Sequence, residues 1–166
     1  MNKPIISMIA AIGENRELGA DNDLPWGRAL PTDMMRFRDK TRGHVVIMGK
    51  KTFESMDNKA LPNRVNIVIT RDEDFKPNGV VVAHSVEEAI AEAKKSEPGE
   101  IFIIGGGKIF ELALPYADKF YLTLIRANFP KADIFFPEYK DDFKKVVYRE
   151  KVEENGYSYE FLDLER

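Results

Sequence analysis

The residues around Asp33 place a carboxylate beside apolar side chains near the start of a predicted helix. Pro31 suits the first position of a helix, which puts Asp33 in the first turn. Helical spacing then brings Asp33 to the side that carries Met34 and Phe37. A carboxylate among apolar side chains needs a donor or a proton, and a flat, amidine-like heterocycle offers two N–H donors. The pattern alone also fits an acid that only complements the helix dipole at the surface.

Two apolar runs end in glycine followed by lysine and a predicted helix. They are Ile47-Met48-Gly49-Lys50-Lys51-Thr52 and Ile103-Ile104-Gly105-Gly106-Gly107-Lys108. In a parallel sheet both helix starts lie at the same edge, where free N–H groups can bind a pyrophosphate and glycine allows its close approach. The two motifs together therefore predict a nucleotide cofactor, although each alone equally fits a tight strand-to-helix turn.

The details of these motifs narrow the class of nucleotide. Neither motif is a P-loop, because the glycine spacing is one residue too long and no Ser or Thr follows the lysine. The second motif is also not a full dinucleotide-binding fingerprint, since Phe110 occupies the position of the third glycine. The run 65–70 continues into Arg71 instead of an acid that would bind a ribose 2′-hydroxyl. With the lysines of the two motifs, Arg71 favours a 2′-phosphate and hence NADPH, although each lysine alone could be a solvated surface charge.

Composition excludes several other classes of site and partner. The two histidines, His44 and His84, have no acidic partner at metal spacing, so no metal site is expected. The absence of cysteine excludes disulfides and thiolate sites and suits a reducing cytoplasm. The net charge of -3 and the interspersed charges give no nucleic-acid surface, and the apolar N-terminal stretch is too short to span a membrane. We expect a cytoplasmic monomer with a small-molecule partner.

The elements that position these residues alternate between strand and helix. Five near-continuous hydrophobic runs, each typical of a strand buried on both faces of a parallel sheet, cover 5–12, 45–48, 65–70, 80–83 and 101–104. Helices are predicted at 32–40, 50–56, 85–96 and 108–113, the third with a Ser85/Glu88 capping box. Further extended runs cover 120–127, 144–152 and 157–164, the last two around a Glu-Asn-Gly turn.

This order predicts the α/β class. With 166 residues and 43% hydrophobic content, residues 1–166 suit a single domain. We expect a central, mostly parallel twisted sheet with an antiparallel C-terminal edge hairpin, flanked by about four helices. The loops 13–26 and 59–64 are the longest irregular segments, and long loops in small domains usually carry function.

Motifs in the same order along the whole chain resemble the dihydrofolate reductase family. The matching segments are Ile9-Ala10-Ala11, Leu24-Pro25-Trp26, Leu30-Pro31-x-Asp33, Ile47-Met48-Gly49-Lys50-Lys51-Thr52, Leu61-Pro62-Asn63-Arg64-x-Asn66, Ile104-Gly105-Gly106-Gly107 and Asp133-x-x-Phe136-Pro137. The resemblance implies reduction of 7,8-dihydrofolate to 5,6,7,8-tetrahydrofolate, with hydride transfer from NADPH C4 to pterin C6 and protonation of N5. That activity supports one-carbon metabolism and the synthesis of thymidylate and purines, and makes its enzymes targets of antifolate inhibitors.

The resemblance also implies a catalytic group of Asp33, Trp26 and Thr123. In it, Asp33 holds the pterin N3 and 2-amino group and supports protonation of N5 through ordered water, to which Thr123 is linked. Arg64 is implied to grip the α-carboxylate of the substrate's glutamate tail, a task suited to a guanidinium. The other implied substrate contacts are Ile9, Ala10, Ala11, Met34, Phe37, Arg38, Met56, Leu61, Ile104 and Phe110.

For the cofactor, the resemblance implies contacts at both glycine motifs and on the first strand and its loop. These residues are Ala11, Ile12, Gly19, Leu24, Gly49, Lys50, Lys51, Thr52, Thr70, Arg71, Gly105, Gly106, Gly107, Lys108 and Ile109. It further implies a cis peptide between Gly105 and Gly106 and a mobile lid over 13–24 with its polar tip at 19–23.

Four departures from the family pattern bear on the lid and on inhibitor fit rather than on the reaction class. Two extra residues lie between Trp26 and Leu30, and Leu24 replaces a frequent Met. Phe110 replaces a common Tyr, and the segment 58–60 lengthens a loop.

Two other functions remain as alternatives. A riboflavin-pathway pyrimidine reductase has a similar fold and uses NADPH, but it would not explain Pro25, Trp26 and Asp33 together. A non-enzymatic nucleotide-binding module would use the glycine motifs and leave Asp33 without a task.

Overall fold

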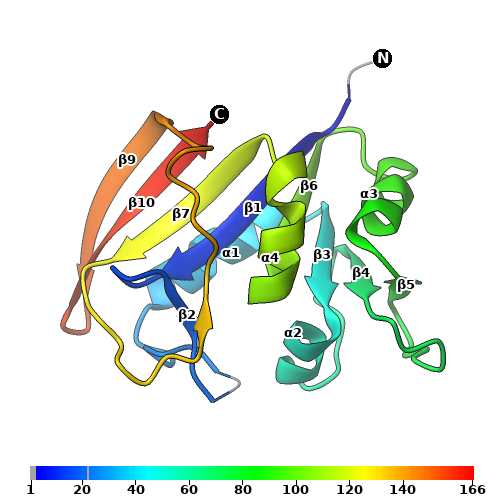
Figure 1. Ribbon diagram of the computed structural model, residues 1–166, viewed down its shortest axis with the longest axis horizontal. Coiled ribbons are helices and arrows are strands. Elements are labelled where there is room, and N and C mark those ends of the chain that lie inside the picture. The colour runs from blue at the N-terminus through cyan, green and yellow to red at the C-terminus, as the bar shows by residue number, and fades with distance from the viewer. Residues whose placement is uncertain (1–2, 22) are drawn as a thin grey trace.

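A twisted sheet runs through the molecule, which the computed structural model describes over residues 3–21 and 23–166 (Figure 1). Its strand order is β5-β4-β3-β6-β1-β7-β10-β9. The strands are β1 (Ile5–Ile12), β3 (Val45–Gly49), β4 (Val65–Ile69), β5 (Val81–Ala83), β6 (Glu100–Gly105), β7 (Lys119–Ile125), β9 (Lys145–Glu154) and β10 (Tyr157–Glu165). The strands from β5 to β7 in this order are parallel, and β10 pairs antiparallel with both β7 and β9. The predicted parallel sheet with an antiparallel edge hairpin is confirmed.

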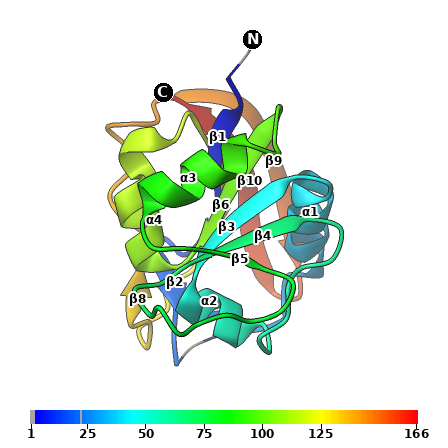
Figure 2. The same ribbon diagram turned by 90° about the vertical axis from the view of Figure 1, so that its right-hand side faces the viewer.

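Helices cover both faces of the sheet (Figure 2). They are α1 (Pro31–Thr41), α2 (Lys50–Ser55), α3 (Val86–Lys94) and α4 (Gly107–Ala113), with a short 3-10 turn, η1 (Leu114–Tyr116). All four predicted helices form. The Ser85 side chain accepts the N–H of Glu88 at 3.0 Å, as the predicted capping signal requires.

A second, two-stranded sheet lies at the edge of the molecule and was not predicted. It pairs β2 (Glu17–Gly19) with β8 (Ile134–Phe135). The prediction that 13–26 is irregular throughout is wrong, because a strand of three residues is too short to show a hydrophobic period. Through this pairing the loop after β1 is held against a segment more than a hundred residues away.

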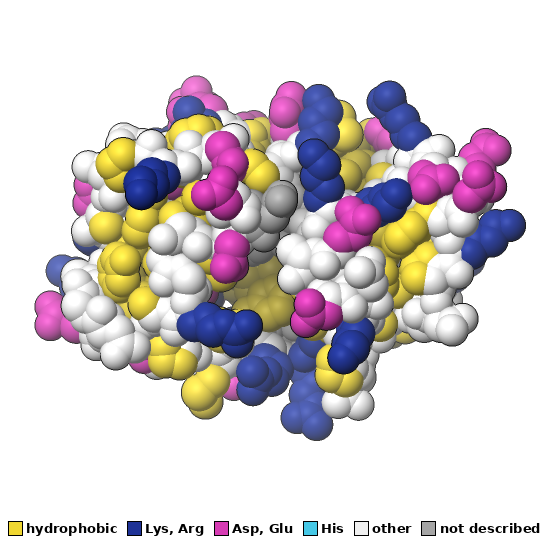
Figure 3. Space-filling model, turned by 90° about the horizontal axis from the view of Figure 1, so that it is seen from below, with side chains coloured by type: hydrophobic (Ala, Val, Ile, Leu, Met, Phe, Trp, Pro, Cys, Tyr) yellow, Lys and Arg dark blue, Asp and Glu magenta, His cyan; other side chains and the backbone are white. Residues whose placement is uncertain are grey.

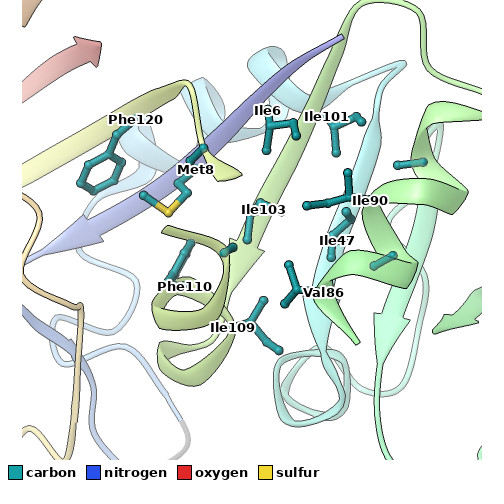
Figure 4. Packing of buried hydrophobic residues seen from close by; sticks show 14 of the residues in the cluster. Ile6, Met8, Ile47, Val86, Ile90, Ile101, Ile103, Ile109, Phe110 and Phe120 are labelled. Atoms are coloured by element: carbon teal, nitrogen blue, oxygen red, sulfur yellow. The ribbon is translucent and has the colours of Figure 1, made fainter. Parts of the chain in front are cut away.

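The two faces of the main sheet bury separate sets of side chains, since residues alternate along each strand. On β1, Met8 and Ile12 enter the larger cluster, which α3 and α4 cover (Figure 4), whereas Ile9 enters a second cluster on the face of α1 and α2. A third cluster forms around Trp26. Within residues 3–21 and 23–166, no helix is long and apolar enough to cross a membrane.

Candidate active site

The carboxylate of Asp33 lies in the first turn of α1, facing the sheet. Thr123, which is buried on β7, donates a hydrogen bond from Oγ1 to Asp33 Oδ1 at 2.6 Å. Burial raises the pKa of Asp33 above its ordinary value, and the negative charge of Glu154 raises it further. The Thr123 hydroxyl and the Arg36 cation act in the opposite direction without cancelling the effect of burial. The group is therefore suited to hold a proton or to accept donors from a ligand.

Trp26 belongs to the cluster on the Thr123 side of the site, where Ala11 and Phe161 flank Thr123 on the neighbouring strands. Its side chain is 6% exposed, and the ring of Phe129 meets it edge-on with centroids 5.5 Å apart. The other members of this cluster are Leu30, Ile125, Tyr159 and Phe161, with Ala11 packed at its border. An indole held in this way excludes water from its side of the site.

The opposite wall is apolar and comes from the second cluster. Five predicted substrate contacts belong to that cluster: Ile9, Phe37, Met56, Leu61 and Ile104. Met34 is 45% exposed. Seen from the carboxyl ends of the parallel strands, the surface has a central recess with apolar side chains at its floor and charged side chains around its rim (Figure 3). Such a recess suits a flat aromatic ligand with few polar groups.

Arg64 offers a cation at a turn next to this apolar wall. The side chain of Asn66 closes the turn: its Oδ1 accepts the N–H of Leu61 at 2.9 Å, and its Nδ2 donates to the carbonyl of Arg64 at 3.1 Å. Nε of Arg64 is buried and has no hydrogen-bond partner among the residues that the structure describes. Desolvation, followed by the charges of Arg38 and Arg42, lowers the pKa of Arg64. An anionic ligand group would satisfy both the donor and the clustered positive charge.

Arg42 was absent from the predicted site. The signal that could have found it is its spacing of four residues from Arg38: Arg42 is the residue that caps the end of α1, and its N–H donates to the carbonyl of Arg38. Glu154 was also missed, because it comes from the distant β9 strand and nothing in its local sequence connects it with Asp33.

The two glycine motifs meet as predicted, because β3 and β6 are parallel neighbours. Helices α2 and α4 begin after Gly49 and Gly106, and neither start has a side-chain cap. A Cβ on Gly49 would lie 3.0 Å from Ile109, and one on Gly106 would lie 3.2 Å from Oγ1 of Thr52. The peptide between Gly105 and Gly106 is cis, as the resemblance implied. The close approach leaves N–H groups without side-chain partners at one edge, which fits the phosphates of a dinucleotide.

Basic side chains flank this edge. Nζ of Lys50 lies 3.2 Å from Oδ2 of Asp72 and over the ring of Phe75 at 5.2 Å. Arg71 is exposed two residues after the end of β4, and Lys51 and Lys108 are exposed on α2 and α4. Thr70, beside Arg71, accepts a hydrogen bond from the N–H of Asp72 at its hydroxyl. These cations fit a phosphate at the edge of the sheet where β4 ends.

Some predicted contacts have side chains on the other face of the sheet. Ile12 and Phe110 are fully enclosed in the larger cluster, and Ala10 and Ile109 belong to the same cluster. The alternation along β1 separates Ala10 and Ile12 from Ile9 and Ala11. Phe110 lies close to the second glycine motif, because its ring would be 3.5 Å from a Cβ on Gly105.

The predicted lid is tied down at its first half. Gly19 is buried within β2, and its carbonyl accepts the N–H of Asp133 at 2.9 Å. The predicted tip, 19–23, includes Asn22, which lies outside the described residues. Leu24 is 40% exposed at the end of the loop.

The histidines lie away from the recess. The ring of His44 meets the carboxylate of Glu97 at 2.9 Å, a partner that the sequence analysis did not expect, and Nδ1 of His84 lies 2.8 Å from the carbonyl of Thr70. Among the described residues there is no group of three acidic, His or Cys side chains that could hold a metal ion.

Similarity to known proteins covers nearly the whole chain. Residues 5–166 match the family model described as dihydrofolate reductase. The chain is 43% identical over 165 residues to the dihydrofolate reductase of Bacillus subtilis (strain 168), a match that covers 98% of this chain and 95% of that one. To the dihydrofolate reductase of Buchnera aphidicola subsp. Acyrthosiphon pisum (strain APS) it is 42% identical, over 97% of this chain and 99% of that one. The fold is similar to that of dihydrofolate reductase from Enterococcus faecalis complexed with NADP(H) and RAB-propyl, with a TM-score of 0.87 and 35% identity over 98% of this chain and 96% of that one.

Proposed function

Because the chain belongs to the dihydrofolate reductase family, whose members reduce 7,8-dihydrofolate to 5,6,7,8-tetrahydrofolate with NADPH, we propose that Asp33 is the carboxylate that holds the pterin. The chain is an NADPH-dependent oxidoreductase. The observation that carries the role of Asp33 is its placement: a carboxylate with a raised pKa, bonded to one buried hydroxyl, at the side of an apolar recess. Neither a pyrimidine reductase nor a non-enzymatic nucleotide-binding module is favoured by the family match.

In this proposal the carboxylate of Asp33 accepts N3–H and the 2-amino group of the pterin. Thr123 fixes Oδ1 and so sets the plane in which those two donors bind. The carboxylate also orders the water molecule through which N5 is protonated, and burial, which raises the pKa of Asp33, makes the site more ready to take up a proton. Protonated N5 makes pterin C6 electrophilic. NADPH, when bound, supplies the hydride that C6 accepts.

The apolar walls position the rest of the substrate. Ile9 and Ile104 lie on neighbouring strands below the pterin, and Phe37, Met56 and Leu61 line the side towards the aminobenzoyl group. Trp26 and Ala11 close the other side against water. Arg64, with Arg38 nearby, binds the α-carboxylate of the glutamate tail, which gives its buried Nε a partner.

For the cofactor, the uncapped starts of α2 and α4 bind the pyrophosphate, and Lys50 with Arg71 binds the 2′-phosphate. Thr52, Thr70, Lys51 and Lys108 complete the phosphate-binding edge. Gly19 and Leu24 belong to a lid that covers the nicotinamide ring.

We further propose that the protein acts as a cytoplasmic monomer, a single domain over residues 1–166, that binds antifolate inhibitors in the recess and does not bind nucleic acid. The net charge of -3 and the absence of cysteine support this proposal.

The test of this assignment is the pH profile of Asp33→Asn. Asparagine keeps the shape but cannot hold the proton or accept two donors, so turnover of dihydrofolate with NADPH should fall roughly 10²- to 10⁴-fold at neutral pH and recover partly in acid, where N5 is protonated from solution. The decrease in absorbance of NADPH measures the rate. A variant with the activity and pH profile of the unmodified protein would exclude the role of Asp33.

A further inference from the structure

The first turn of α1, which carries Asp33, has no cap from its own sequence. Leu30 occupies the cap position and makes no side-chain hydrogen bond, and Pro31 has no N–H. The N–H of Thr32 is therefore one of the free donors that a helix start must satisfy from elsewhere. Of the residues of α1, only Thr41 at the far end is buried. Leu30 packs in the cluster around Trp26 and so holds this end of the helix, but an apolar side chain cannot accept the N–H of Thr32.

Glu154, at the end of β9, supplies the missing cap. Its Oε1 accepts the N–H of Thr32 at 3.1 Å, and its Oε2 accepts the hydroxyl of the same residue. These residues are 122 positions apart in the sequence. A carboxylate at a helix N-terminus also interacts favourably with the helix dipole. The hairpin and the helix start are therefore joined by one ionised side chain.

Two neighbours make this contact rigid. The hydroxyl of Tyr159, on β10, donates to Oε1 of Glu154 at 2.8 Å, and the ring of Tyr159 is completely buried in the cluster around Trp26. In the hairpin turn, Nδ2 of Asn155 donates to the carbonyl of Ala29 at 2.8 Å. The hairpin tip is thus hydrogen-bonded to the chain on both sides of Pro31, at Ala29 and at Thr32.

We propose that Glu154 is a positioning residue for Asp33: it fixes the first turn of α1 so that the Asp33 carboxylate stays against Thr123 and faces the pterin. This inference rests on the proposed role of Asp33. The second cluster that lines the recess contains no residue of the β9–β10 hairpin. In this proposal the hairpin nevertheless contributes to substrate binding.

The charge of Glu154 has a second effect, on protonation. Burial raises the pKa of Asp33 most, the hydroxyl of Thr123 and the cation of Arg36 lower it, and the charge of Glu154 raises it. Tyr159 faces both acids from β10, and burial together with the charges of both acids raises its own pKa. Removing the negative charge of Glu154 should therefore lower the pKa of Asp33. A proton would then leave Asp33 at a lower pH, and the pH profile of hydride transfer would move with it.

Two substitutions separate these effects. Glu154→Ala removes cap and charge, so KM for dihydrofolate should rise roughly fivefold to tenfold while KM for NADPH stays unchanged. Glu154→Gln keeps an oxygen for the N–H of Thr32 but removes the charge, so KM should change less, and the carboxyl carbon of Asp33, followed by NMR, should titrate at a lower pH. The matched control is Glu153→Gln, an exposed acid one position away on the same strand, which should leave both quantities unchanged.

Two results would overturn the inference. One is a parallel rise of both KM values in Glu154→Ala, which would mean general loosening of the fold; the other is an unchanged titration of Asp33 in Glu154→Gln. Asp33→Asn distinguishes this failure from that of the proposed function. If Asp33→Asn is inactive at neutral pH while the Glu154 variants behave like the control, only the role of Glu154 is wrong.

Discussion

Asp33 on α1 and Asp163 on β10 both lie near Arg36 of α1, and their hydrogen-bond partners differ. Asp163 accepts a hydrogen bond from Nη2 of Arg36 at 2.6 Å, with side chains that are 8% and 14% exposed. The guanidinium of Arg36 also lies over the ring of Phe161 at 4.5 Å. Asp33 lies one helical turn from Arg36, but its hydrogen bond comes from the neutral hydroxyl of Thr123. Arg36 thus forms its ion pair with Asp163 and not with Asp33.

Arginines show the same division. Arg36 is enclosed by an acid and aromatic rings, whereas Arg64 has a buried Nε without a partner among the described residues and two further arginines nearby. Arg36 has an acidic partner within the fold. Within residues 3–21 and 23–166, Asp33 and Arg64 have no ion pair. Unpaired charge is costly inside a protein, so the second region indicates where a ligand with both donors and a carboxylate completes the structure.

Asp163→Asn should break the paired region and give the largest effect on stability. The variant removes the carboxylate that Arg36 contacts directly, so the free energy of unfolding should fall by roughly 3–5 kcal/mol. Urea unfolding measures the loss, and turnover per folded molecule should remain close to that of the unmodified protein. Asp39→Asn, an exposed acid on the same helix, is the control for helix charge. A small loss of stability together with a large loss of turnover would show that the two regions are not separable.

Arg64→Gln should change the unpaired region with the next largest effect, on substrate binding alone. Loss of a charge-assisted pair with the glutamate tail should raise KM for dihydrofolate about tenfold to a hundredfold and leave KM for NADPH unchanged. The free energy of unfolding should hardly change, because the ligand-free protein loses no hydrogen bond to Nε. A dihydropterin without the glutamate tail is the matched substrate control. If its KM rises equally, Arg64 acts on the recess as a whole and not on the tail.

The sequence predicts the elements of the fold better than it predicts the partners of the charged side chains. The strands and helices follow from local patterns, so the carboxyl edge where the two glycine motifs meet could be predicted. The position of Asp33 in the first turn could also be predicted, from Pro31. The resemblance linked Thr123 to the site through water but did not give its direct hydrogen bond to Asp33. Glu154 was missed altogether, since it comes from a strand far along the chain and its placement depends on the register of β7, β9 and β10.

Side-chain direction was the other unpredictable part. The resemblance assigns Ile12 and Phe110 to the site by position, yet both side chains point into the larger cluster. A strand at the centre of a sheet is hydrophobic on both faces, so its composition does not reveal which face a ligand uses. The short pairing of β2 with β8 was invisible for a related reason, because three residues carry no period.

The smallest expected effect is the pH dependence of stability, which should have opposite signs for two carboxylates on opposite faces of the sheet. The raised pKa of Asp33 means that the folded protein keeps a proton at pH values where the unfolded chain, with the ordinary pKa of 3.8, has lost it. Stability contributed by Asp33 therefore falls as the pH rises through that window. A hydrogen bond and an ion pair with Arg126 lower the pKa of Glu160, so its contribution is present above the ordinary value of 4.5 and is lost as the pH falls.

Urea unfolding of Asp33→Asn and Glu160→Gln from acid to neutral pH can resolve the two signs. Relative to the unmodified protein, Asp33→Asn should become more stable as the pH rises, because asparagine removes a carboxylate whose desolvation outweighs the effects of Thr123 and Arg36. Glu160→Gln should become less stable over the same range. If both differences had the same sign, the two carboxylates would share one kind of environment, and the placement of Asp33 would give no reason to expect a ligand there. Opposite signs would show that the ionised form of Asp33 lowers the free energy of unfolding of the ligand-free protein. Bound substrate would offset that loss by donating N3–H and the 2-amino group to the carboxylate.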